Sequence, residues 1–169
     1  MTFFDLRAAR PRSGEEYRDE QQVEIAPLVF GGLRYVAVPE QVPAELAVTR
    51  ATTGTVFELR LRTRLHGPCY RCLADAVIER DLSLREYQAT SPDGSEELTT
   101  PYVVDSRLDL SSWARDSLVL ALPDKILCRD SCAGLCPVCG KDLNHEPHEH
   151  AEEEPDPRWA ALAELRDKL

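Results

Sequence analysis

Cysteine side chains are the residues of this chain best suited to chemistry. The chain has six cysteines in 169 residues, and four of them fall within one stretch of twelve residues: Cys128, Cys132, Cys136 and Cys139. Cys136-Pro-Val-Cys139-Gly140 has the form of a zinc knuckle, in which a tight turn ending in glycine directs two thiolates to the same side. The spacing therefore predicts a metal-binding segment.

Thiols can also form disulfides, so the cellular compartment matters. Asp5 and Arg7 interrupt the N-terminal stretch before any apolar run as long as a signal peptide, and no segment has the length and hydropathy of a membrane span. We therefore expect a cytoplasmic protein without a membrane partner. In that compartment clustered cysteines are more often metal ligands than disulfides.

The clearest strand prediction covers residues 56–66, where apolar and cationic side chains alternate. One face would carry Leu59, Leu61, Thr63 and Leu65, and the other Arg60, Arg62, Arg64 and His66. Gly67-Pro68 ends this strand, and residues 74–87 alternate again, as a returning antiparallel strand would. Cys69 and Cys72 would then lie at the tip of a hairpin.

The remaining chain predicts a mostly β protein of the α+β class, with an antiparallel sheet or a small barrel. Short strands are expected over residues 2–6, 22–26, 45–49 and 102–104, with loops over 7–20 and 89–100. Apolar residues at helical spacing predict one packed helix at about 110–122, with Asp109 or Ser111 as its N-cap. A second apolar stripe predicts a C-terminal helix: Trp159, Leu162 and Leu165.

These elements suggest three regions. Residues 1–127 would form a β-rich core domain that includes the helix. Residues 128–150 would form a zinc-knuckle segment of cysteines and histidines packed on that core. Residues 151–169 would form an acidic linker followed by the C-terminal helix.

Structural zinc takes four ligands, so six cysteines do not make complete sites by themselves. His148 and His150 are separated by one residue, so both imidazoles would point the same way in an extended segment. In one arrangement there are two ions, one held by Cys69, Cys72, Cys128 and Cys132 and the other by Cys136, Cys139, His148 and His150. In the rival arrangement one ion is held by the four clustered cysteines alone. The sequence predicts zinc and leaves both arrangements open.

Charge limits the partners of the chain. The formal net charge is -10, and residues 81–169 carry all of the excess, with 9 basic and 19 acidic residues. An acidic protein repels phosphates at long range, so any RNA contact would be local. The cationic face of residues 56–66, extended at the hairpin tip, supplies the candidate RNA-binding residues: Arg60, Arg62, Arg64 and Arg71. The alternative is a solvated strand face paired with acidic neighbours.

No catalytic residue is predicted, and no small-molecule substrate site is indicated. Cys132, Cys136 and Cys139 match the CxxxCxxC spacing of radical-enzyme iron–sulfur clusters, but the chain lacks the barrel pattern of such enzymes. Cys69 and Cys72 match a CxxC redox pair, but they lie between two strands, whereas a thioredoxin-like motif opens a helix. We therefore expect a protein that is not an enzyme.

Several motifs in consistent order resemble one bacterial family. They are Gly67-Pro-Cys-Tyr-Arg-Cys-Leu73 after the long strand, Leu120-Ala-Leu-Pro123 at the helix end, the cysteine segment from Cys128 to Asn144, and Asp156-Pro-Arg-Trp-Ala-Ala-Leu162. From about Asp5 to the C-terminus the chain resembles the YceD family, the large ribosomal RNA subunit accumulation proteins. Similar members often carry Cys-x-Cys where this chain has His148-Glu-His150, and this favours those histidines as ligands.

The resemblance implies a cytoplasmic non-enzyme needed for normal accumulation of 23S ribosomal RNA. The leading hypothesis is therefore a ribosome biogenesis factor with structural zinc, which acts on 23S RNA or on a precursor of the large subunit. The alternative hypothesis is a protein–protein adaptor whose acidic half binds a basic ribosomal protein. A third, a thiol oxidoreductase, would require a reactive thiol at Cys69 or Cys72.

Overall fold

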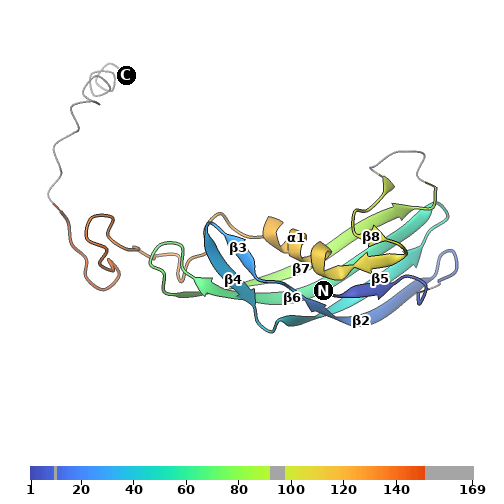
Figure 1. Cartoon of the computed structure of the whole chain (residues 1–169), viewed down its shortest axis with the longest axis horizontal. Helices are drawn as coiled ribbons and strands as arrows, with labels where there is room; N and C mark the ends of the chain where they lie inside the picture. Colours follow the sequence, from blue (N-terminus) through green and yellow to red (C-terminus); the bar gives the residue numbers. More distant parts are fainter. Residues whose placement is uncertain (10, 92–97, 151–169) are drawn as a thin grey trace, which may run out of the picture. The chain divides into compact units, whose positions relative to one another are not determined.

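The computed structural model describes residues 1–9, 11–91 and 98–150. The chain divides into a compact unit, Met1–Cys132, and a second unit that begins at Ala133. The described strands and the described helix all belong to the first unit (Figure 1). Among the described residues, no helix is both long enough and apolar enough to cross a membrane.

The first unit is built on one large antiparallel sheet. The strand order is β2 (Glu16–Glu24), β5 (Gln41–Arg50), β6 (Gly54–Pro68), β4 (Leu33–Ala37) and β3 (Leu28–Phe30), and β7 (Asp75–Ala89) also pairs with β6. β5 and β4 pair with successive parts of one edge of β6, and β7 pairs with the other edge along its whole length. β7 pairs with no other described strand, so it borders the sheet (Figure 1).

The β6–β7 hairpin confirms the clearest strand prediction. Fifteen residues of each strand pair in one register, from Gly54 opposite Ala89 to Pro68 opposite Asp75. The alternating pattern also sets the two faces as expected, because the arginines between the apolar residues are exposed. The buried face of β6 carries Leu59, Leu61, Thr63 and Leu65.

A smaller sheet leads into the helix. Its strands are ordered β1 (Phe3–Asp5), β9 (Arg107–Asp109) and β8 (Val103–Val104), and α1 (Leu110–Leu120) follows β9 directly. α1 contacts β1, β2 and β7, and so reaches two of the strands that border the large sheet. Trp113 and Leu118 of α1 are fully buried in the core that the helix shares with the sheet.

The mostly β, antiparallel architecture with one helix is therefore confirmed. The predicted C-terminal helix lies outside the described residues, as does the middle of the predicted loop over residues 89–100.

Three sequence predictions need correction. β2 begins at Glu16, inside the predicted loop over residues 7–20. Tyr17 in this part of β2 packs against the core, but the residues around it are charged, so no repeated apolar alternation is visible. The segment nevertheless pairs with β5, and its Arg18 contacts Glu45 at 2.9 Å. The helix ends at Leu120, two residues before the predicted boundary. β3, β4 and β9, each of three to five residues, were not predicted.

Asp109 is the N-cap of α1, which confirms one of the two predicted caps. Its backbone is extended, with a φ of -81° and a ψ of 93°. Its carboxylate accepts hydrogen bonds from the Ser112 N–H at 3.0 Å and from the Ser112 hydroxyl at 2.7 Å. The cap thus satisfies one of the N–H groups that the first turn of a helix leaves unpaired.

Replacing this cap should destabilise the protein measurably. We expect Asp109→Ala to lower the free energy of unfolding by about 1 kcal/mol, the typical cost of losing an N-cap carboxylate. Urea unfolding followed by circular dichroism measures the change. Asp124→Ala, at an exposed position after the helix, serves as the control and should change the value by less than about 0.5 kcal/mol. Equal losses in both variants would contradict the capping role.

Candidate metal centres

Two groups of side chains lie close enough to share a metal ion each. The first contains Cys69, Cys72, Cys128 and Cys132, and the second contains Cys136, Cys139, His148 and His150. Within each group the candidate ligand atoms all lie within 4.8 Å of one another. The first group belongs to the compact unit Met1–Cys132, and the second belongs to the unit that follows it.

A tight turn at the end of the β6–β7 hairpin positions the first two thiols. The Cys69 N–H donates to the Ala74 carbonyl at 2.7 Å, and the Leu73 N–H donates to the Cys69 carbonyl at 3.0 Å. Leu73 has a φ of 61°, in the left-handed region that favours glycine. Gly140, at the same position after the second Cys-x-x-Cys pair, has a φ of 73°. Both turns therefore bend in the same way, although only one ends in glycine.

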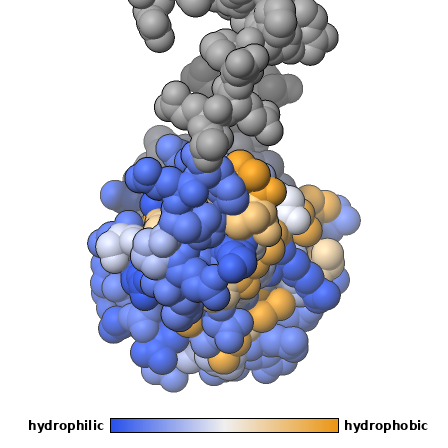
Figure 2. All heavy atoms as spheres, turned by 90° about the vertical axis from the view of Figure 1, so that its left-hand side faces the viewer, coloured by the Kyte–Doolittle hydropathy of each residue, from blue (hydrophilic) through white to orange (hydrophobic). Residues whose placement is uncertain are grey.

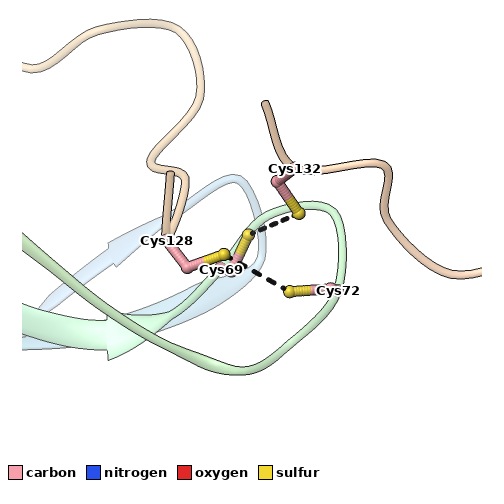
Figure 3. A group of neighbouring side chains, drawn as sticks. All are labelled: Cys69, Cys72, Cys128 and Cys132. Atoms are coloured by element: carbon pink, nitrogen blue, oxygen red, sulfur yellow. Dashed lines mark hydrogen bonds between the residues drawn. The ribbon is translucent and has the colours of Figure 1, made fainter. Parts of the chain in front are cut away.

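The segment after α1 brings two more thiols to this turn. The Tyr70 N–H donates to the carbonyl of buried Ile126 at 2.8 Å, and the Arg71 guanidinium donates to the Cys132 carbonyl at 2.6 Å. Figure 3 shows the two segments with their sulfur atoms turned toward one another. Residues more than fifty positions apart in the sequence are thus held together by hydrogen bonds that do not involve the thiols.

The sulfur spacing of the first group fits tetrahedral zinc. The Sγ atoms of Cys69 and Cys132 are 3.8 Å apart, and those of Cys72 and Cys128 are 3.7 Å apart (Figure 3). A tetrahedron with zinc–sulfur bonds of about 2.3 Å has sulfur–sulfur edges of about 3.8 Å. The observed distances are far longer than the ~2.05 Å of a disulfide bond. Four thiolates at this spacing are a donor set that suits structural zinc.

The electrostatics of the first group favour a bound cation. Burial opposes ionisation of Cys69, but the backbone N–H groups of Cys72 and Cys128 outweigh it and lower the Cys69 pKa to about 6. For Cys72 the Ala74 N–H favours the thiolate, but burial and the neighbouring thiols outweigh it and raise the pKa to about 12. Thiolates this close therefore repel one another, and a divalent ion would relieve that repulsion.

Short backbone hydrogen bonds fold the second unit around its own ligand group. The Cys136 N–H donates to the Lys141 carbonyl at 2.8 Å, and the Gly140 N–H donates to the Cys136 carbonyl at 2.9 Å. Leu135 and Asp142 form an antiparallel bridge beside this turn. These bonds close a tight turn at the Cys-Pro-Val-Cys-Gly pattern, and its action as a zinc knuckle stays a prediction.

His148 is oriented toward the second pair of thiols by its own loop. Its Nδ1 lies 2.7 Å from the Glu146 carbonyl, so Nδ1–H donates there and Nε2 is left as the ligand atom. Nε2 lies 3.1 Å from the Sγ of Cys139, and the rings of His148 and His150 have centroids 5.0 Å apart. The bond to Glu146 raises the pKa of His148, and the N–H of Cys139 lowers the pKa of Cys136 to about 6.

The membership of the two groups corresponds to the two-ion arrangement of the sequence analysis. Cys128 and Cys132 lie with the hairpin thiols, and both histidines lie with Cys136 and Cys139. Metal binding by these residues stays a prediction, because donor atoms that lie close together are necessary for binding but do not demonstrate it.

The candidate RNA-binding arginines of β6 lie among carboxylates. Arg60 is 4.0 Å from Glu58, Arg62 is 2.9 Å from Glu79 and 3.5 Å from Asp81, and Arg64 is 2.5 Å from Glu79. The hydrogen bond from Arg62 and the charge of Arg64 lower the pKa of Glu79, so its carboxylate stays ionised beside them. Arg71 lies apart from this row, where it supports the Cys132 carbonyl. The positive charge of the strand face is therefore balanced locally.

This pairing agrees with the alternative of a strand face paired with acidic neighbours, and the sequence also contains a signal for which residues those neighbours are. In a hairpin with a fixed register, Glu79 must lie opposite Arg64 and Asp81 opposite Arg62. Aligning the two alternating segments about their turn would have revealed the acidic partners. The supporting roles of Arg71 and of the Glu146 carbonyl had no comparable signal, because they depend on contacts outside any regular element.

An antiparallel β unit with four converging thiols, followed by a unit in which two cysteines and two histidines converge, defines a class of β-rich proteins with candidate metal sites. The chain belongs to the YceD family: the family model described as large ribosomal RNA subunit accumulation protein YceD matches residues 57–166. Uncharacterized proteins of Mycobacterium tuberculosis and Mycobacterium bovis are 34% identical over 141 residues, covering 79% of this chain and 67% of theirs. Uncharacterized protein YlbN of Bacillus subtilis is 27% identical over 111 residues, 64% of each chain. No solved structure gives a significant match.

Metal content distinguishes the two ligand groups. We expect two zinc ions per chain, one for each group of four donors. Cys72→Ser should reduce the content to one ion by damaging the first group, and His148→Ala should reduce it to one by damaging the second. Elemental analysis of purified protein measures the ratio.

His145→Ala provides a matched control for the histidine variant, because His145 lies in the same loop but pairs with Asp142 at 2.7 Å. It should retain both ions. A content of one ion in the unaltered protein, kept by His148→Ala, would favour a single cysteine-only site.

Removal of metal should destabilise the first unit. With the ion gone, the thiols of the first group must protonate or repel one another, and the hairpin tip loses its link to the segment after α1. We expect a strong chelator to lower the thermal unfolding midpoint and zinc to restore it, as measured by calorimetry. An unchanged midpoint after verified loss of zinc would contradict a structural role.

Proposed function

We propose that this protein is a non-enzymatic cytoplasmic factor that supports accumulation of 23S ribosomal RNA and biogenesis of the large ribosomal subunit. The observation that carries the proposal is the family match over residues 57–166, because the family is described as large ribosomal RNA subunit accumulation protein. The match covers β6 from its fourth residue on, β7, α1 and all eight candidate metal ligands. The parts of the chain with the most specific chemistry are thus the parts shared with the family.

The ligand groups support a structural role for zinc. A catalytic zinc site keeps one position open for water or substrate, whereas each group here offers four protein donors. Cys69 and Cys132 are also fully buried, which leaves little access for a substrate. In this proposal the ion holds the hairpin tip against the segment after α1 and performs no chemistry on a substrate.

The charge distribution supports a protein partner as the second candidate mode of action. The arginines of β6 lie beside carboxylates of β6 and β7, so the strand face offers little net positive charge to a phosphate backbone. The formal charge of -10 instead suits a basic partner, such as a ribosomal protein. The adaptor mode would affect 23S RNA through that partner, whereas the RNA mode requires direct contact with the arginine face.

The general proposal is tested by removing the protein from cells that produce it. We expect the ratio of 23S to 16S ribosomal RNA to fall, and a copy of the unaltered gene to restore it. Gel quantification of total RNA and sucrose gradient profiles measure the ratio and the large-subunit particles. An unchanged ratio and unchanged particles would contradict a role in large-subunit biogenesis.

Neutral substitutions on β6 separate the two modes. Arg60→Gln combined with Arg62→Gln removes two positive charges without adding negative ones, and exposed ion pairs of this kind contribute only about 0–1 kcal/mol each. If the adaptor mode is right, this variant should restore the 23S to 16S ratio as well as the unaltered protein does.

Arg18→Gln serves as the matched control, because Arg18 is also an exposed sheet arginine paired with carboxylates, those of Glu16 and Glu45. Loss of restoration with the β6 variant alone, with unchanged thermal stability, would support direct RNA contact by the arginine face.

A further inference from the structure

β7 leaves one border of the large sheet without a partner strand among the described residues (Figure 1). Its ladder with β6 keeps one register over fifteen residues, and the strand contains neither glycine nor proline. Natural proteins shorten, bulge or cover a long border strand, because its free backbone groups pair readily with other strands. A regular border of this length is therefore a surface that a further strand fits.

Backbone hydrogen bonds at the two ends of the hairpin show which residues face outward. The Thr90 N–H donates to the Thr53 carbonyl at 2.9 Å, and the Cys69 N–H donates to the Ala74 carbonyl at 2.7 Å. In one continuous antiparallel register, even-numbered residues of β7 thus bond to β6, and odd-numbered residues direct their N–H and C=O groups away from it. Within the described chain, no backbone group bonds to these outward groups between Val77 and Tyr87.

Water or a partner must satisfy these groups, because a backbone group that is buried without a hydrogen bond is costly. The side chains of Val77, Glu79, Asp81, Ser83 and Arg85 are exposed, so this part of the border is open to solvent. Among the described residues, one side chain bonds to an outward group here: Arg80 donates to the Glu79 carbonyl at 2.8 Å.

We propose that β7 pairs with β7 of a second copy of this chain, antiparallel and centred on Ser83, to join two sheets into one. The sequence of β7 is self-complementary in this register. Pairs directly opposite one another would be Ser83 with Ser83, Leu82 with Leu84, Asp81 with Arg85, and Arg80 with Glu86. Two-fold symmetry makes every pair except the central one occur twice.

The backbone limits the possible registers, and the side chains choose among them. Odd-numbered residues of one copy face odd-numbered residues of the other, so that the outward groups meet, whenever the two-fold axis passes through a residue such as Leu82, Ser83 or Leu84. Moving the centre by one residue, to Leu82 or Leu84, separates Arg80 from Glu86 and Asp81 from Arg85. With Leu82 at the centre, the one kind of unlike pair that forms in their place is Glu79 opposite Arg85, and with Leu84 at the centre none forms. The centre at Ser83 therefore opposes the most unlike charges.

Arg80 and Glu86 are charged residues that have no ion-pair partner in the described part of their own chain. Both are half-buried, on the face of β7 that also carries buried Leu82 and half-buried Leu84. Arg80 bonds to two backbone carbonyls, those of Glu79 and Ala121, at 2.8 Å each. A second copy would supply each charge with its opposite on a partly apolar surface.

An extended peptide from another protein would satisfy the same backbone groups. It would not account for a sequence that matches itself about one residue in both charge and apolar character. Self-complementarity is the requirement of a two-fold interface, in which the same surface is used by both copies. A second copy of this chain is therefore the occupant that the pattern specifies.

Sedimentation equilibrium of the full-length, zinc-loaded protein tests the proposal. We expect a concentration-dependent dimer of about twice the 19.0 kDa mass of one chain. Arg80→Glu would place like charges opposite one another at two positions and should weaken the dimer at least about tenfold. Glu86→Arg should do the same. The double variant Arg80→Glu with Glu86→Arg restores unlike pairs and should return the dissociation constant to near its original value.

Two further variants keep the result decisive. Arg18→Glu reverses a charge on β2, at the opposite border of the sheet, and should leave the dimer unchanged. Ser83→Arg places two guanidinium groups opposite each other at the axis and should also weaken the dimer, which provides a second test if Arg80→Glu unfolds. A monomer at every concentration would overturn the proposal. So would a dimer that none of the β7 variants weakens, or a double variant as weak as either single one.

Discussion

The unbroken pairing of β6 with β7 is the constraint on which most of this structure depends. Because the register does not change over fifteen residues, it decides which side chains enter the core and which face solvent. The same register sets Arg62 and Arg64 beside acidic residues of the opposite strand. At the closed end of the hairpin it presents Cys69 and Cys72, and at its open side it leaves a long regular border. One ladder thus links the core, the surface charge and the candidate metal ligands.

The hairpin tip is also where sequence-distant parts of the chain meet. Residues 69–72 and 128–132 approach through backbone contacts from Tyr70 and Arg71, so the thiols converge on geometry that the surrounding chain already supplies. An ion bound there would close a long loop that includes β7 and α1, and closing such a loop restricts the unfolded chain. The second unit is different, because a few local hydrogen bonds among residues 133–148 hold its ligands. In Figure 2, hydrophilic residues make up most of the surface that faces the viewer, with some hydrophobic residues among them.

The sequence predicted those features whose cause is local or periodic. Alternation predicted β6 and β7, helical spacing and a capping aspartate predicted α1, and the Cys-Pro-Val-Cys-Gly pattern predicted the tight turn from Cys136 to Gly140. The prediction of a loop over residues 7–20 was wrong for its last five residues. These residues pair with β5, but they show no periodic apolar pattern that would indicate a strand. The choice between one ion and two was open because spacing along the chain does not say which distant thiols meet. The positive φ of Leu73 was not predicted, because leucine, unlike glycine, does not indicate a left-handed backbone conformation.

The most direct test of the metal centres is X-ray absorption at the zinc edge, because it reports the donor atoms around the ion. If one site has four sulfur ligands and the other has two sulfur and two nitrogen ligands, the average zinc should have three sulfur neighbours at about 2.3 Å and one nitrogen neighbour at about 2.0 Å. His148→Ala should shift the average toward sulfur alone as the second site loses its ion. Zinc bound mainly by oxygen, or a sulfur-only environment that His148→Ala leaves unchanged, would contradict two centres built from these eight side chains.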